Sequence, residues 1–333
     1  MLDLIEKVSF RKIFFFVVLF TYSQFTRAQV DYSVVSVPQE AGLEFMRITS
    51  DNDYVCMPSV NRTYGGINWL TNRILSVSAD GTQLAYLSYR NETTNIFIKD
   101  IRTQGSSMQR TNRQHVLDFS YSPDGKYLVF SETDGNMNQL FQTDARAGYV
   151  CRQITSGNQD YSPVYSDDMK NIFFARQEAN GVSIWSYNVQ NNFLSSYARG
   201  MNPFPVSSSP LIVCVRNNPE GRGEIWRVNT NNSVEECILS DARRSFTTPM
   251  VSPNGEWILC VGSSMLMNGT MQYWNTDIFA CKVDGTQLLQ LTYHAADDLS
   301  PVWSRDGQYV YFISQRGSST GVANVWRIKF RPF

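Results

Sequence analysis

A short turn motif recurs along this chain at nearly constant spacing. A serine, one variable residue, an aspartate or asparagine and a glycine occupy positions 78–81, 122–125, 252–255 and 304–307. Gly81 lies 44 residues before Gly125, and Gly125 lies 44 residues before Met169, which ends the degenerate copy Asp167-Asp168-Met169. A fixed period of this length is typical of repeat architectures, in which each copy forms one supersecondary unit.

Short apolar runs follow the turns and predict strands. They occupy residues 84–87, 128–130, 172–175, 212–215, 258–261 and 310–313, and the fourth of them belongs to a copy whose turn is replaced by Ser207-Ser208-Ser209-Pro210. A later strand in each copy carries one aromatic residue: Phe97, Phe141, Trp185, Trp226, Phe279 or Trp326. Four short strands per period indicate a β-propeller blade.

We therefore predict an all-β, six-bladed β-propeller of four-stranded blades. The expected blades lie near 74–111, 116–155, 160–200, 202–240, 244–292 and 296–330. The last copy ends after its third strand, whereas residues 43–49 have the pattern of a fourth strand without a blade. We expect this latch strand to pair with residues 325–329, which would complete the last blade, close the ring and remove an open sheet edge.

The N-terminus has the pattern of a targeting segment. Lys7, Arg11 and Lys12 precede the apolar run 13–20, and Thr26-Arg27-Ala28 resembles a cleavage site. The run is short for a membrane span, so we predict a cleaved signal peptide over residues 1–28 rather than an uncleaved anchor. Residues 29–42 form a short lead before the propeller at 43–333. The expected location is periplasmic or secreted.

The first strands and turns resemble those of a known family. Ser120-Tyr121-Ser122-Pro123-Asp124-Gly125 and the run from Ser300-Pro301 to Asp306-Gly307 are similar to the WD40-like repeat of the TolB C-terminal propeller. The resemblance covers residues 43–333, and TolB-like proteins also carry an α/β domain before the propeller. The same repeat builds the propellers of prolyl-oligopeptidase-type peptidases and some sugar lyases, so the fold alone does not define the activity.

Composition narrows the function. The chain has 29 basic and 30 acidic residues without a block of one sign, which disfavours nucleic acid and anionic membranes as partners. Its only histidines are His115 and His294. The G-x-S-x-G pattern at 317–321 is not followed by the histidine that a serine hydrolase needs. No catalytic residue, metal site or cofactor is therefore predicted.

Two loops and the cysteines leave alternatives open. Asp134 to Asn138 and Asp51 to Asp53 carry alternating oxygen donors, which suit either hairpin turns or a structural cation. The six cysteines, Cys56, Cys151, Cys214, Cys237, Cys260 and Cys281, are interpreted as core thiols, with Cys260–Cys281 as the one disulfide to test.

Two sets of residues are candidate ligand sites. Asp160 and Asp298 begin innermost strands and, with His294 nearby, are expected to line the central channel. Two long insertions, 262–276 and 50–72, should emerge on one face of the ring. They carry an apolar set: Tyr54, Met57, Tyr64, Trp69, Met265, Leu266, Met267, Met271, Tyr273 and Trp274. Exposed together, these side chains would form a partner-binding patch, although the insertions could instead plug the channel mouth.

The sequence favours a monomeric, exported, non-catalytic scaffold that binds a protein or an envelope polymer through loops on one face. The alternative is a carbohydrate-binding protein or a metal-dependent sugar-processing enzyme with its site at the channel mouth. Several converging histidines or carboxylates would favour that enzyme.

Overall fold

A computed structural model describes residues 32–58, 62–63, 66–67, 73–103, 105–147, 149–268 and 270–332. The predicted signal peptide, 1–28, lies outside these residues. The described chain is all-β apart from two 3-10 turns, η1 (Pro38–Glu40) and η2 (Asp51–Asp53). No described helix is long and apolar enough to cross a bilayer.

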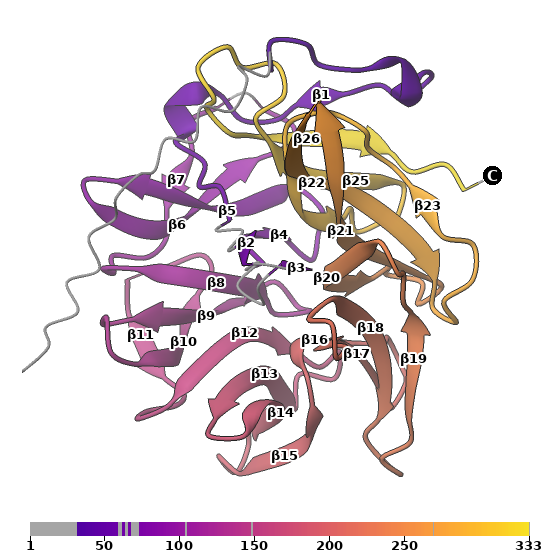
Figure 1. The fold of residues 1–333 in the computed structure, drawn as a ribbon. Helices are drawn as coiled ribbons and strands as arrows, with labels where there is room; N and C mark the ends of the chain where they lie inside the picture. Colours follow the sequence, from indigo (N-terminus) through magenta and orange to yellow (C-terminus); the bar gives the residue numbers. More distant parts are fainter. Residues whose placement is uncertain are drawn as a thin grey trace, which may run out of the picture. The chain divides into compact units, whose positions relative to one another are not determined.

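The described strands form antiparallel groups of four (Figure 1), and the parallel pairing of Asn138 with Gln159 joins the second and third groups into one eight-stranded sheet. The first group is β4 (Leu75–Val77), β5 (Gln83–Arg90), β6 (Thr93–Asp100) and β7 (Met108–Gln109). The second is β8 (Val116–Tyr121), β9 (Tyr127–Thr133), β10 (Asn138–Asp144) and β11 (Cys151–Gln153). The third is β12 (Gln159–Tyr165), β13 (Asn171–Glu178), β14 (Gly181–Asn188) and β15 (Leu194–Arg199).

The remaining groups follow the same plan. The fourth is β16 (Met201–Pro205), β17 (Leu211–Asn217), β18 (Gly223–Asn229) and β19 (Glu235–Leu239), and the fifth is β20 (Arg244–Val251), β21 (Trp257–Asn268), β22 (Met271–Lys282) and β23 (Leu289–Gln290). The sixth is β24 (Asp298–Trp303), β25 (Tyr309–Ser314), β26 (Asn324–Lys329) and β1 (Met46–Arg47). A small ribbon, β2 (Arg62–Thr63) with β3 (Gly66–Ile67), forms a separate two-stranded sheet, and β3 contacts β20.

The predicted pairing of the latch segment with the last copy is present. β1 runs antiparallel to β26, with Met46 opposite Arg327 and Arg47 opposite Trp326. The Ile48 amide also donates to the Val325 carbonyl at 2.8 Å. Only two residues of the predicted 43–49 segment have strand geometry, and η2 begins soon after it, at Asp51.

The innermost strands, β4, β8, β12, β16, β20 and β24, are joined to one another by hydrogen bonds. A left-handed residue bulges four of them just before a proline: Ser162, Asn202, Thr248 and Ser300, with φ from 49° to 53°. Groups at the bulges bond to the neighbouring strand. The Ser162 amide donates to the Asp118 carboxyl group at 2.9 Å, and the Ser300 hydroxyl accepts from the Ile74 amide at 2.8 Å. These bonds link β8 to β12 and β24 to β4.

The second and third strands supply most of the core. Leu84 to Leu87 in β5 and Val310 to Ile313 in β25 are buried, and they belong to one cluster that also includes side chains of the second and fifth groups. Alternate side chains of a strand point to opposite faces, so these continuous apolar runs pack against a neighbouring group on each side. No sheet formed by the described strands closes on itself.

Candidate functional site

The turn between the first and second strands is locked by its own side chains. In the sixth group the Ser304 hydroxyl donates to Asp306 and accepts from the Tyr309 amide at 2.8 Å, while Asp306 accepts from the Gln308 amide at 3.0 Å. The same network recurs at Ser78, Ser122, Ser166 and Ser252. Gly307, with φ 70°, supplies the left-handed conformation that the turn requires. The recurring residues of the motif therefore fix the turn and leave one position free.

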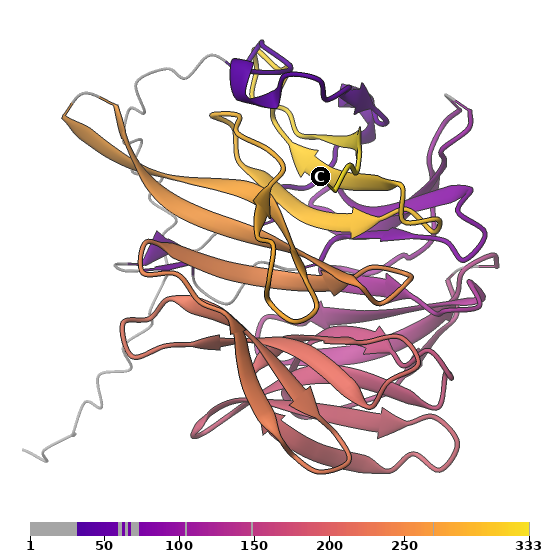
Figure 2. The ribbon, with the colours of Figure 1, turned by 90° about the vertical axis from the view of Figure 1, so that its right-hand side faces the viewer.

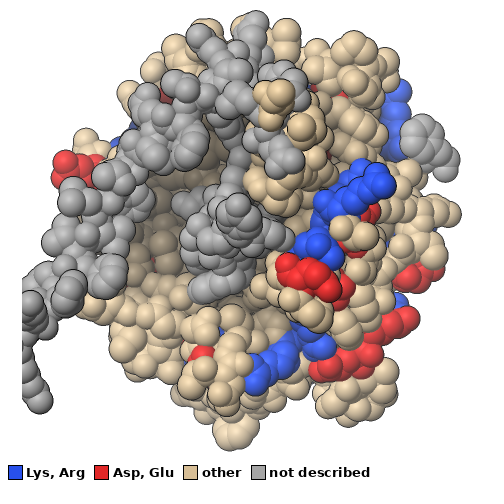
Figure 3. All heavy atoms as spheres, in the orientation of Figure 1, with Lys and Arg blue, Asp and Glu red and all other residues tan. Residues whose placement is uncertain are grey.

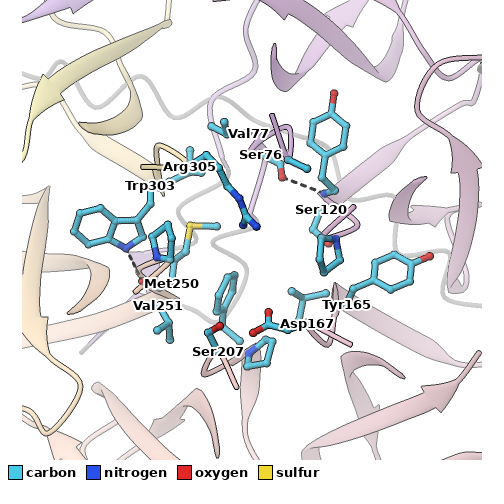
Figure 4. A pocket seen from close by; sticks show the side chains of 18 of the residues that line it. Ser76, Val77, Ser120, Tyr165, Asp167, Ser207, Met250, Val251, Trp303 and Arg305 are labelled. Atoms are coloured by element: carbon cyan, nitrogen blue, oxygen red, sulfur yellow. Dashed lines mark hydrogen bonds between the residues drawn. The ribbon is translucent and has the colours of Figure 1, made fainter. Parts of the chain in front are cut away.

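That free position faces a pocket. The residues after the motif serines, and Ser207 in the variant turn, lie on the pocket wall: Ala79, Pro123, Asp167, Ser207, Pro253 and Arg305. The pocket has a volume of about 310 Å³ and lies between the C-terminal ends of the six innermost strands. Other wall residues come from those strands and include Phe204 and Val302, together with Ser76, Ser120 and Met250, which are labelled in Figure 4.

Two opposite charges point into this pocket. Arg305 follows β24 in the sixth group and Asp167 follows β12 in the third, and Figure 4 shows both side chains directed toward the middle. Asp167 accepts a hydrogen bond from the Ser208 amide at 3.2 Å. Both residues are exposed. A ligand here meets a cation and an anion held on rigid turns, with proline, serine and apolar surface between them.

The predicted channel residues lie at the other end of the same strands. Asp160 is fully buried and receives two hydrogen bonds from Arg176, at 2.7 and 2.9 Å. Asp298 is also fully buried and pairs with Arg316 at 2.6 Å. His294 is buried, and its Nδ1 accepts from the Ala296 amide at 2.9 Å. None of the three lines the pocket, and a channel-ligand role for them stays a prediction.

Arg316 is the centre of a buried charge cluster. It donates to both oxygens of Glu40, at 3.1 Å each, so the lead before β1 is fastened to the sixth group. Burial raises the pKa of Asp298 to about 6, although Arg316 opposes this shift. Burial likewise raises the pKa of nearby Asp277 well above its ordinary value, and the charges of Asp298 and Glu40 add to that shift.

The predicted apolar patch is described in part. Met265, Leu266 and Met267 are exposed at the end of the long β21–β22 hairpin, where Met265 lies opposite Trp274 and Leu266 opposite Tyr273. This hairpin projects from the body of the fold (Figure 2). Tyr54 is exposed, and Met57 is half-buried. Tyr64 and Trp69 lie outside the described residues, as do the surroundings of the Met271 side chain.

The hairpin end and the pocket lie at opposite ends of β21, because the β20–β21 turn contributes to the pocket and the β21–β22 turn forms the hairpin end. Figure 3 shows one face of the molecule, on which basic and acidic side chains are intermixed toward the lower right. The part of that face formed by described residues therefore presents no broad surface of one charge.

The two candidate cation loops differ in structure. Asp134 accepts from the Asn136 and Met137 amides at 2.9 and 2.8 Å, which is the hairpin-turn alternative. Asp53 is buried and receives hydrogen bonds from Tyr86, Lys99 and Ser107. No group of three or more His, Cys, Asp or Glu side chains in the described chain is arranged to hold a metal ion.

The cysteines are all free thiols. The proposed Cys260–Cys281 disulfide is not formed: Cys260 lies opposite Phe279, and Cys281 lies opposite Ile258. The interpretation as six core thiols holds for Cys214, Cys260 and Cys281, whereas Cys237 is exposed.

Sequence reasoning missed Asp167 and Arg305 as site residues. Both occupy the variable position of the repeat, and a motif search discards that position because it differs between copies. Reading only this position across the six turns would have identified the charged pair.

Comparison with known proteins agrees with the repeat. The sequence model of the TolB β-propeller domain matches residues 70–265. A search of curated protein sequences gave no significant match.

Solved structures share the fold at low sequence identity. TolB from Acinetobacter baumannii has a TM-score of 0.58 at 18% identity, and the alignment covers 69% of this chain and 56% of that one. A TolB structure from Agrobacterium tumefaciens has a TM-score of 0.57 at 17% identity, covering 78% and 90%. Oligogalacturonate lyase from Vibrio parahaemolyticus has a TM-score of 0.57 at 12% identity, covering 90% and 96%. These likenesses concern the fold, and the family match extends over more than half of the sequence: the chain belongs to the TolB β-propeller domain family.

Proposed function

We propose that this protein is an exported, six-bladed propeller whose ring is closed by the latch strand and which binds a protein or an envelope polymer. Contacts between consecutive groups support the ring. Hydrogen bonds join β8 to β12, β12 to β16, β16 to β20 and β20 to β24, and others join β24 to β4 and β4 to β8. A Cβ added to Gly81 of the first group would lie 3.4 Å from the Arg305 Cβ of the sixth.

The pocket at the turn end is the observation that carries the binding proposal. Asp167 and Arg305 belong to groups three places apart, so in a six-bladed ring they lie on opposite sides of this pocket. The opening of the pocket at the turn end is called the mouth from here on. Charge-assisted hydrogen bonds are stronger than neutral ones, and two opposed charges fix the direction of a bound chain. We infer that the mouth binds an extended peptide segment carrying an acidic side chain toward Arg305 and a basic one toward Asp167.

Charge reversal tests this assignment. Arg305→Glu and Asp167→Lys should each reduce partner capture from native envelope, measured by crosslinking and mass spectrometry with the purified protein as bait. Arg243→Glu is the matched control, because Arg243 is exposed on the connection between β19 and β20. Capture that is unchanged in both mouth variants would exclude this mouth as the binding site.

A second surface is proposed from the hairpin end and the segment around Tyr54. Exposed methionine and aromatic side chains are favoured anchors in protein interfaces. Replacing Tyr273 and Trp274 by alanine should weaken capture with little change in melting temperature if the hairpin contacts the partner. Full capture, or collapse of the variant on heating, would favour packing of the insertions against the channel.

A carbohydrate ligand is the alternative. The alignment with the Vibrio parahaemolyticus oligogalacturonate lyase covers 96% of that chain, and another solved oligogalacturonate lyase holds manganese. Calorimetric titration of acidic oligosaccharides, with and without Mn²⁺, separates the two functions. Binding or cleavage that Arg305→Glu abolishes would establish the alternative.

Export, cleavage and oligomeric state belong to the same proposal. The N-terminal sequence of the protein recovered from the envelope or medium should start at Gln29, as predicted for signal-peptide cleavage. Light scattering of that material should give the mass of a monomer.

A further inference from the structure

Arg73 lies two residues before the start of β4 and is almost completely buried, with 1% of its surface exposed. Its side chain leaves the first group and reaches the fourth. The guanidinium lies 5.0 Å from the centre of the Phe204 ring, and Nη2 donates to the Pro203 carbonyl at 3.4 Å. The neighbours of β4 in the ring are β24 and β8. Contact with β16 therefore places the guanidinium in the space between the innermost strands.

This buried cation has unused donors. Nε and Nη1 are both inaccessible to solvent and have no hydrogen-bond partner among the described residues. Arginine nitrogens are obligate donors, and an enclosed charge without a partner is strongly unfavourable. Burial lowers the pKa of Arg73 to about 10, so the side chain remains a cation at neutral pH.

The acidic residue whose charge acts on Arg73 does not accept hydrogen bonds from these nitrogens. Asp118 influences Arg73 through its charge, but its oxygens accept from the Ser131 hydroxyl and from the Ser162 amide at 2.9 Å. No ion pair joins Asp118 to Arg73 among the described residues. The structure thus contains a fixed cation, a nearby carboxylate already engaged elsewhere, and two unmet N–H donors.

We propose that a small monovalent anion, a halide or a short carboxylate such as formate, binds inside the ring at Arg73. A monovalent anion supplies an acceptor for the Nε and Nη1 donors, whereas a dianion would bring a second negative charge close to the Asp118 carboxyl group. The burial of Arg73 limits the ligand to a few atoms. Phe204 lines the mouth pocket and covers the guanidinium, but Arg73 itself does not line that pocket. The anion site is therefore separate from the proposed mouth site and does not depend on it.

Binding at this place would link the first and fourth groups through a common ligand. A ligand that binds only the folded state shifts the folding equilibrium by mass action. Once the anion concentration exceeds its dissociation constant, each tenfold increase should raise the apparent folding equilibrium constant about tenfold. A general salt effect does not begin at a dissociation constant, and it does not give a slope of one when the logarithm of the folding equilibrium constant is plotted against the logarithm of the anion concentration.

Thermal and urea unfolding of the purified protein test this at constant ionic strength. Sodium chloride, bromide and formate are each exchanged against sodium gluconate, whose anion is too large for the site. We expect stability to rise with each small anion in the native protein and to be independent of the exchange in Arg73→Met. Arg243→Met is the matched control and should behave like the native protein. Equal anion dependence in native protein and Arg73→Met would overturn the proposal.

Crystals of the unsubstituted protein soaked in sodium bromide give a test that needs no variant. An anomalous peak within hydrogen-bond distance of Nε or Nη1 is expected. Loss of the peak on adding formate would show that carboxylates share the site, and persistence would show a preference for halide. A water molecule or an empty space at these nitrogens in the soaked crystals would contradict the anion site.

Discussion

The two ends of the innermost strands use charge in opposite ways. At the turn end, Asp167 and Arg305 are exposed and are held on turns whose geometry depends on other residues. At the starting end, Asp160 and Asp298 are fully buried and paired with Arg176 and Arg316. The same residue type, aspartate, therefore supports the fold at one end and leaves a charge available to a ligand at the other.

Burial of the partners explains this difference. Both charges of a buried ion pair have lost their hydration. Removing one partner therefore leaves the other charge buried and uncompensated, which lowers the free energy of unfolding. An exposed charge keeps its water and contributes little to stability. Substitutions at the two ends should thus separate stability from binding, and the following experiments test that separation in order of decreasing effect.

Deletion of the latch is expected to have the largest effect. Without residues 43–49 the β26 edge loses β1, and the chain loses the hydrogen bond between Thr49 and Asn324 at 2.9 Å. An open strand edge promotes association with other chains. We expect aggregation or a large fall in melting temperature. Light scattering recorded during heating measures both effects. A truncated protein with an unchanged melting curve would contradict ring closure by this strand.

Arg316→Met should have the next largest effect. The substitution leaves Glu40 and Asp298 buried without their cation, and breaking a buried pair in this way costs about 3–5 kcal/mol. Arg305→Met at the other end should change the free energy of unfolding by about 0.5 kcal/mol or less. Urea denaturation measures both. Similar losses in the two variants would remove the distinction between the ends.

The pH dependence of stability should reveal Asp298. Its folded-state pKa of about 6 lies above the ordinary value of 3.8, so the folded protein takes up an extra proton between these values. The contribution of this group is present below about pH 4 and is lost as the pH rises through 6, by at most about 3 kcal/mol. Native protein should therefore gain stability relative to Asp298→Asn as the pH falls from 7 to 4. Parallel pH profiles of the two proteins would show that Asp298 does not titrate in this range.

The smallest predicted effect compares two adjacent residues of one turn. Ser304→Ala removes hydrogen bonds to Asp306 and from the Tyr309 amide, and we expect a loss of about 1–2 kcal/mol. Arg305→Ala should leave the free energy of unfolding nearly unchanged. The pair of urea curves decides whether the recurring and variable positions have separate roles. A larger loss for Arg305→Ala would contradict that division.

The strands and turns could be predicted from the sequence because the same local residue pattern, which causes each turn, recurs in each copy. Ser-x-Asp-Gly marks each turn through hydrogen bonds that are local in sequence, and the latch was visible as an unmatched strand. The burial of Asp160 and Asp298 was not predictable in the same way. It depends on Arg176 and Arg316, which lie on the second strands or after them, and on Glu40, which lies more than 250 residues from Asp298 along the chain. Arg73 was missed because it lies before its strand, in no repeated position.

Because other residues hold the turns in place, the side chains that line the mouth can be substituted. Six variable positions, Ala79, Pro123, Asp167, Ser207, Pro253 and Arg305, share one opening. In five of them the hydrogen bonds that shape the turn come from the flanking residues. New side chains at these positions would alter what the opening recognises with little effect on folding. The proposed ring would therefore serve as a scaffold for combinatorial libraries, in which selectivity is chosen one turn at a time.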